Sequence, residues 1–118
     1  MWYAIQVATG REESIKRVCE KMLDRKVYEA IFIIRFNRAK RYYGKWHREC
    51  EIMFPGYLFI ETQQPLELYE SLKEIPEITK FLGREEKNFL SIEASKEALF
   101  KSLLNIHYEI DISKGVIV

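Results

Sequence analysis

The stretch FPGYLFIE, residues 54–61, constrains the fold of this chain more than any other. Its proline and glycine form a turn signal, and the residues that follow are aromatic or aliphatic, which predicts a strand. Because side chains alternate across a strand, we expect Leu58 and Ile60 to share one face. Tyr57 and Phe59 then lie on the other face. Both faces are apolar, so each needs a cover, either from a helix of this chain or from a partner.

The chain before this strand begins with a predicted strand and helix. Residues 2–8 alternate weakly and end at Thr9-Gly10, which indicates a strand followed by a turn. Thr9 and Glu12 have the spacing of a capping box, in which each side chain bonds an unpaired amide at a helix start. Apolar residues then recur at helical spacing, and they are Ile15, Val18, Cys19, Met22 and Leu23.

A long hairpin is predicted between this helix and the strand after Gly56. Residues 28–36 are β-branched and aromatic, and they are apolar on both faces through Ile34, which predicts a covered strand. A basic segment with a glycine follows. Residues 49–54 then alternate acidic and apolar side chains, which predicts the returning strand.

Helices and one short strand are predicted for the remainder. Pro65 suits the first turn of a second helix, which Pro76 is expected to end. Residues 78–82 read as a short strand, 84–88 as a polar loop and 93–104 as a third helix. The core face of that helix is expected to carry Ala94, Ala98, Leu99, Leu103 and Leu104. The order predicts an α+β fold with a mostly antiparallel sheet of four to five strands flanked by three helices.

Composition limits the class of protein. The chain has 118 residues, is 47% hydrophobic and carries a formal net charge of +1, as expected for one globular domain. The longest apolar run, 30–34, is too short to cross a bilayer, and residues 1–6 lack the basic start of a secretory signal. Two cysteines, Cys19 and Cys50, suggest a reducing compartment, so we expect a cytoplasmic protein without membrane contact.

Motifs for catalysis or metal binding are weak. The sequence holds no nucleophile elbow, P-loop or HExxH motif. His47 and Cys50 form one close pair that Cys19 or His107 could extend, but structural zinc sites usually present two such pairs. We therefore predict no catalytic residue, no metal site and no cofactor.

A basic segment provides a candidate nucleic-acid site. Residues 30–48 contain no acid, and their cations alternate with Tyr42, Tyr43 and Trp46. Cations neutralise phosphates, and aromatic rings stack on unpaired bases. The candidate contacts within the segment are Arg38, Lys40, Arg41, Lys45 and Arg48. The alternative is a solvated hairpin whose charges balance acidic surface elsewhere.

Four sequence features together resemble the NusG N-terminal domain. They are the start Trp2-Tyr3-Ala4-Ile5-Gln6, Gly10 before an acidic helix opening, the run 54–60 and the run IPEITKFLG, residues 75–83. Their order and spacing match that domain over residues 1–104. The basic Tyr-Tyr-Gly-Lys-Trp hairpin, residues 42–46, is more similar to specialised paralogues of the RfaH and LoaP kind.

The resemblance implies a transcription elongation and antitermination factor, not an enzyme. Such domains dock on the clamp helices of the largest RNA polymerase subunit, reach the gate loop of the second subunit and reduce pausing and termination. Carried over by motif, the polymerase-binding residues would be Phe54, Tyr57 and Phe59, with Phe81 nearby. Arg11 and the hairpin cations would contact upstream or non-template DNA. We expect a monomer.

The family also carries a C-terminal KOW domain. By resemblance, residues 1–104 form the NusG-like domain, and residues 105–118 are a linker towards that KOW domain, which would recruit an RNA hairpin. A second hypothesis comes from the residues alone. It is a stand-alone α+β RNA-binding module that uses the basic aromatic hairpin, residues 35–48.

Overall fold

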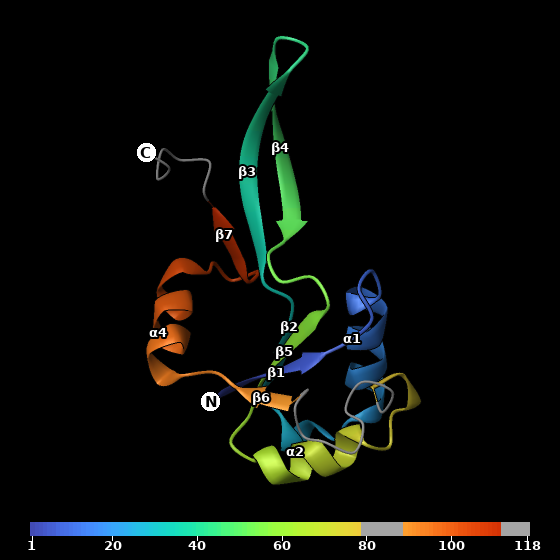
Figure 1. Cartoon of the computed structure of the whole chain (residues 1–118). Helices are drawn as coiled ribbons and strands as arrows, with labels where there is room; N and C mark the ends of the chain where they lie inside the picture. Colours follow the sequence, from blue (N-terminus) through green and yellow to red (C-terminus); the bar gives the residue numbers. More distant parts are fainter. Residues whose placement is uncertain (79–88, 112–118) are drawn as a thin grey trace.

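A four-stranded antiparallel sheet lies at the centre of the computed structural model, which describes residues 1–78 and 89–111 (Figure 1). The strands follow the order β2 (Ala30–Phe32), β5 (Tyr57–Glu61), β1 (Trp2–Gln6) and β6 (Phe89–Ser91). In the central pair, Ala4 lies opposite Phe59 and Ile5 opposite Leu58. The predicted α+β class with a mostly antiparallel sheet is confirmed.

Two apolar clusters cover the two faces of this sheet. Helices α1 (Glu12–Met22) and α2 (Pro65–Leu72) pack on one face, and α4 (Ala94–Leu103) lies on the other (Figure 1). The first cluster contains buried residues of β1, α1, β5 and α2, among them Ile5, Ile15, Cys19, Leu58, Ile60, Leu68 and Leu72. The second is smaller and mostly aromatic, with Trp2, Ala4, Phe32, Ile34 and Phe59 at its centre.

The predicted hairpin is present and projects away from the central sheet (Figure 1). It consists of β3 (Arg35–Tyr42) and β4 (Lys45–Ile52), joined by a two-residue turn at Tyr43 and Gly44. Both turn residues have positive φ, 54° and 73°, as the hairpin turns that match strand twist require. A short strand that no sequence pattern predicts, β7 (Glu109–Asp111), pairs in parallel with β3.

The apolar run 28–36 contributes to both sheets instead of forming one strand. A short 3-10 turn, η1 (Arg25–Val27), leads into β2, which ends at Phe32. Ile33 and Ile34 then cross to the hairpin, with Ile33 in the first cluster and Ile34 in the second. The two-sided apolar pattern therefore comes from a chain that passes between two packed layers.

The chain after α2 differs from the sequence prediction. The helix ends at Leu72, and residues 76–78 are helical again, so Pro76 starts a helical segment. Ile78 is fully buried in the first cluster and is not in a strand. Residues 79–82 of the predicted strand and the predicted loop 84–88 lie outside the described residues. The fourth strand of the sheet is β6.

Helix α4 lies close to its predicted range but presents a different face to the core. Phe100 and Leu104 pack on the aromatic cluster, whereas Leu99 and Leu103 are 55% and 49% exposed. Ala94 and Ala98 are exposed as well. The large ring of Phe100 fills space above the sheet that alanine could not fill, which determines how the helix is turned. Within residues 1–78 and 89–111, no helix is long and apolar enough to span a bilayer.

Candidate functional site

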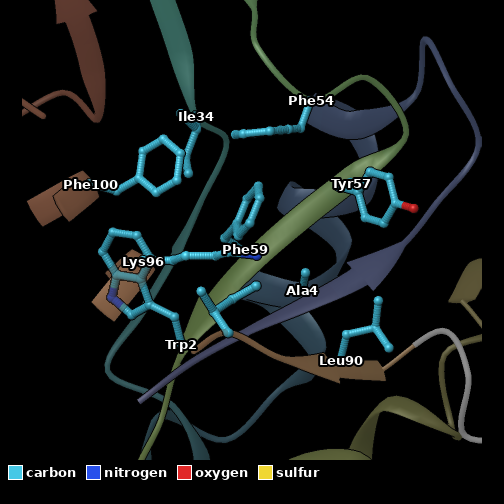
Figure 2. Close-up of a pocket in the computed structure, with 10 residues that line it drawn as sticks. Trp2, Ala4, Ile34, Phe54, Tyr57, Phe59, Leu90, Lys96 and Phe100 are labelled. Atoms are coloured by element: carbon cyan, nitrogen blue, oxygen red, sulfur yellow. The ribbon is translucent and has the colours of Figure 1, made fainter. Parts of the chain in front are cut away.

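An apolar groove opens on the face of the sheet that α4 covers only in part (Figure 2). Its volume is about 250 Å³. Residues from β1, β5, β6, α4 and the connections between elements line it, namely Trp2, Ala4, Ile34, Phe54, Tyr57, Phe59, Leu90, Ile92, Lys96 and Phe100. Open apolar surface of this kind is typical of a docking site.

The alternation of β5 determines which aromatic residues reach the groove. Leu58 and Ile60 point into the first cluster and are fully buried. Tyr57 and Phe59 point the other way, as the sequence predicted. Phe54, from the turn before the strand, joins them, with its ring centroid 5.7 Å from that of Phe59.

The three aromatic residues differ in burial. Phe59 is only 6% exposed and stacks on Phe32, so it belongs to the core as well as to the groove wall. Phe54 and Tyr57 are half-buried and form the accessible rim. Phe81, the fourth residue expected here, lies outside the described residues.

Much of the groove was not predicted as part of the site. Trp2 and Ala4 come from β1, Leu90 from β6, and Lys96 and Phe100 from α4. The spacing of Phe100 and Leu104, one helical turn apart, is a signal for the inward face of α4. It was obscured by the more numerous leucines and alanines on the outer face.

A buried carboxylate holds the turn that precedes β5. Glu12 is 2% exposed and accepts hydrogen bonds from the amides of Gly56, at 2.8 Å, and Gly10, at 2.9 Å. Burial alone would raise the pKa of Glu12, but these amides and the charge of Arg35 outweigh burial and hold that pKa below its usual value. Glu12 therefore fixes the turn between Phe54 and Tyr57 to the start of α1.

This role replaces the predicted capping box. The residue before α1 is Arg11, and no side chain caps the helix. Glu12 is the first helical residue and reaches the amides of two turns, one of them 44 positions away along the chain. Sequence spacing suggested a local bond because the distant Gly56 amide is brought close only by the fold.

Helix α4 is attached to the sheet by charged groups. Glu97 accepts a hydrogen bond from the backbone amide of Trp2 at 2.6 Å. Lys101 lies between Glu97, at 3.1 Å, and Glu61, at 3.4 Å, and its ammonium is 5.8 Å from the Trp2 ring centroid. Burial alone would raise the pKa of Glu97, but its bonds from Lys101 and Trp2 lower it overall.

The predicted nucleic-acid residues do not form one patch. Arg41 packs over the Trp46 ring at 5.9 Å, near the hairpin tip, where Trp46 is 69% exposed. Strand pairing places Arg48 on the same face as these two residues, and Arg38 and Lys45 on the opposite face. Arg11 is exposed just before α1, outside the hairpin. The side chain of Lys40 is not among those described.

Two of the predicted nucleic-acid arginines have carboxylate partners. Arg38 pairs with Glu51 at 2.9 Å, and Arg48 pairs with Asp111 of β7. Glu109 of β7 also accepts a hydrogen bond from the side-chain amide of Asn37 at 2.9 Å. The acids of β7 thus offset positive charge at the base of the hairpin, while Arg41 and Lys45 lie closer to the tip.

The cysteines do not come together as metal ligands. Cys19 is buried in the first cluster, where burial raises the pKa of its thiol to about 12, and Cys50 is exposed on β4. In the described part of the chain, no group of three or more His, Cys, Asp or Glu side chains could hold a metal ion.

The chain is similar in sequence to known transcription proteins. The family model described as "NusG: Transcription termination factor nusG" matches residues 1–101. The transcription termination/antitermination protein NusG of Helicobacter pylori strain ATCC 700392 / 26695 is 26% identical over 95 residues, covering 73% of this chain and 52% of the relative. The same protein of strain J99 / ATCC 700824 is 26% identical over 91 residues, with the same coverage. The chain thus spans about half the length of these curated relatives.

Proposed function

We propose that this chain, which belongs to the NusG family, acts in transcription elongation and antitermination by docking on RNA polymerase through its apolar groove. The names of the two curated relatives support the general role in termination and antitermination. No catalytic step is required of the chain, because such a factor acts by binding.

In the proposed complex, the clamp helices of the largest polymerase subunit fill the groove. Phe54 and Tyr57 contact the helices at the rim, and Phe59 forms the wall behind them. The start of α2, where Leu66 is 77% exposed, faces the gate loop of the second subunit. A domain that bridges both contacts holds the clamp closed, which reduces pausing and termination.

The observation that carries this proposal is the groove itself. It combines an almost wholly apolar lining with an opening to solvent, in a chain of the right family. An apolar surface held open by a rigid sheet costs little to desolvate, and aromatic side chains there are the usual anchors of an interface.

Binding to an isolated clamp-helix fragment tests the proposal. Replacing Phe54 and Tyr57 together by alanine removes both accessible rings and leaves Phe59 in the core. We expect the affinity to fall by about tenfold or more, because buried aromatic anchors supply much of the energy of an interface. Calorimetric titration measures the loss, and circular dichroism checks the fold.

Leu99 and Leu103 provide the matched control. They are also apolar and partly exposed, but they do not line the groove. Their double replacement by alanine should leave binding unchanged. Equal affinity of the wild type and the Phe54/Tyr57 variant would refute the groove as the docking surface.

The hairpin supports a second candidate function, the binding of nucleic acid. Trp46 with Arg41 across from it forms an exposed pair of ring and cation, suited to an unpaired base and its phosphate. In the polymerase complex this contact would be with upstream or non-template DNA. Without polymerase, it is the alternative function of an RNA-binding module.

Titration with single-stranded DNA and RNA oligonucleotides at two salt concentrations, beside the clamp-fragment titration, distinguishes the elongation factor from the independent RNA-binding module. Clamp binding together with weak, salt-sensitive binding of DNA favours the elongation factor. Tight binding of RNA with no clamp binding favours the independent module. A LoaP-like specialisation is a further part of the proposal, and the basic β-hairpin, which resembles that of such paralogues, supports it. In a LoaP-like factor, a KOW domain would bind an RNA hairpin.

A further inference from the structure

Two lysines of α4 lie near the aromatic cluster and differ in their surroundings. Lys101 is held between Glu97 and Glu61 and above the ring of Trp2. Its charge is therefore already balanced within the chain. Lys96 has no ion pair in the part of the chain that the structure describes.

Lys96 is also the single charged side chain among the described residues that line the groove. Figure 2 shows it extending from α4 into the groove, towards Phe59. The helix places Lys96 one turn before Phe100, whose ring centroid is 5.7 Å from that of Phe54. The ammonium group thus lies beside the aromatic surface that a docked partner would cover.

A partner that fills the groove removes water from this ammonium group. Removing water from an unpaired charge costs free energy unless an opposite charge or other polar groups replace it. The groove itself offers no carboxylate among its described lining residues. The compensating group must therefore come from the partner, or the lysine must extend out to solvent.

We propose that Lys96 is a specificity-determining residue of the groove, which selects a partner helix carrying a carboxylate between its apolar contacts. This inference rests on the proposed function, because it names the chemistry that the clamp helices would present at this groove. The carboxylate pairs with the Lys96 ammonium, while the neighbouring apolar residues of the partner contact Phe54, Phe59 and Phe100. Apolar helices without the acid bind less well, because they leave the ammonium group unpaired.

The test uses the whole chain and a clamp-helix fragment of the largest polymerase subunit. Lys96→Met keeps the length and apolar surface of the side chain and removes its charge. We expect affinity to fall by about fivefold at low salt, and the difference from wild type to shrink as salt rises. Lys96→Glu should weaken binding further, by about tenfold or more, because it places two like charges together.

Charge reversal in the partner identifies the acid. Each acidic residue of the clamp fragment is changed to lysine in turn and titrated against Lys96→Glu. One of these reversals should restore most of the lost affinity. Lys21→Met, on α1, is the matched control, since it changes the net charge equally at an exposed residue away from the groove.

The outcomes separate the inference from the function on which it rests. No binding of the wild type to the fragment refutes the proposed function and the inference with it. Wild-type binding that Lys96→Met leaves equal or stronger, with no reversal that rescues Lys96→Glu, overturns the inference alone. That result would mean that Lys96 extends to solvent when the partner docks.

Discussion

Glu12 joins two turns that are far apart in the sequence, and one of them is the turn between Phe54 and Tyr57 of the groove rim. Its carboxylate accepts hydrogen bonds from the amides of Gly10 and Gly56, and so links the turn after Phe54 to the start of α1. A buried carboxylate is stable only when such bonds replace its water. Here the amides of two glycine turns provide them.

Glu12→Gln should therefore lower stability by about 1–3 kcal/mol at neutral pH, because it weakens two bonds made to a charged acceptor. The pKa of Glu12 in the folded chain lies below its unfolded value, so the unfolded chain binds more protons in the acid range. The stabilisation is complete above the unfolded pKa and is lost as pH falls through the folded one. The difference between the two proteins should thus shrink in acid.

Urea unfolding of both proteins across the acid range measures this effect. Glu20→Gln is the control, because Glu20 is exposed on the same helix and forms an i,i+4 ion pair with Lys16 at 3.5 Å. Its effect should be small at every pH. A gap between wild type and Glu12→Gln that stays constant down to strong acid would contradict the assigned role.

Gly56 and Gly44 offer a paired test of backbone strain. Both have positive φ, 83° and 73°, but only Gly56 is crowded. A Cβ atom on Gly56 would lie 3.0 Å from Thr9 Oγ1 and 3.4 Å from the Val7 carbonyl oxygen, while one on Gly44 meets open space. We expect Gly44→Ala to cost about 1 kcal/mol and Gly56→Ala about 2 kcal/mol or more. Thermal melts of the two variants provide the comparison, and equal costs would mean that the turn relaxes.

At the scale of elements, the pairing of β7 with the hairpin determines which hairpin cations can contact the phosphates of a nucleic acid. Arg48 pairs with Asp111 of β7, whereas Arg41 packs on Trp46 near the tip. A cation already paired with a carboxylate releases fewer counterions when it meets a phosphate. Arg41 and Arg48 look equivalent in the sequence as phosphate contacts, but their different partners in the fold distinguish them.

Arg41→Ala should reduce the affinity for single-stranded DNA. It should also reduce the slope of the logarithm of the binding constant against the logarithm of salt concentration, by about one. Arg48→Ala should change the slope less and should instead weaken the attachment of β7. Fluorescence titration over a salt series measures the first effect, and amide exchange of residues 109–111 measures the second. A larger loss of slope from Arg48→Ala than from Arg41→Ala would show that β7 detaches when nucleic acid binds.

The sequence predicted those elements whose pattern lies within the element itself. The turn before β5, the proline at the start of α2 and the helical spacing in α1 each lie within one element. The inward face of α4 and the pairing of β7 depend on contacts with distant residues, such as Phe54 with Phe100. The composition of a single helix does not contain that information. The predicted inward position is therefore wrong for Leu99 and Leu103, although it is confirmed for Leu104.

On the scale of the whole molecule, the two faces of the sheet differ in how completely they are covered. One face meets α1 and α2 over a cluster whose central residues are fully buried. The other meets α4 over a smaller aromatic cluster that remains open at the groove. The rim of the groove could be predicted from the run 54–60 alone, but its floor combines β1, β6 and α4, which only the folded chain brings together.

Neighbouring residues of β5 should therefore respond in opposite ways. Leu58→Ala removes a fully buried side chain from the first cluster and should cost about 2–5 kcal/mol of stability. Tyr57→Ala removes a half-buried ring at the rim and should cost less than about 1 kcal/mol, yet it should weaken clamp binding. Urea unfolding and clamp-fragment titration, run where both variants are folded, measure the two quantities. If folded Leu58→Ala loses clamp binding while Tyr57→Ala keeps it, the face of β5 towards α1 and α2 would be the docking face, and the division proposed for this sheet would be wrong.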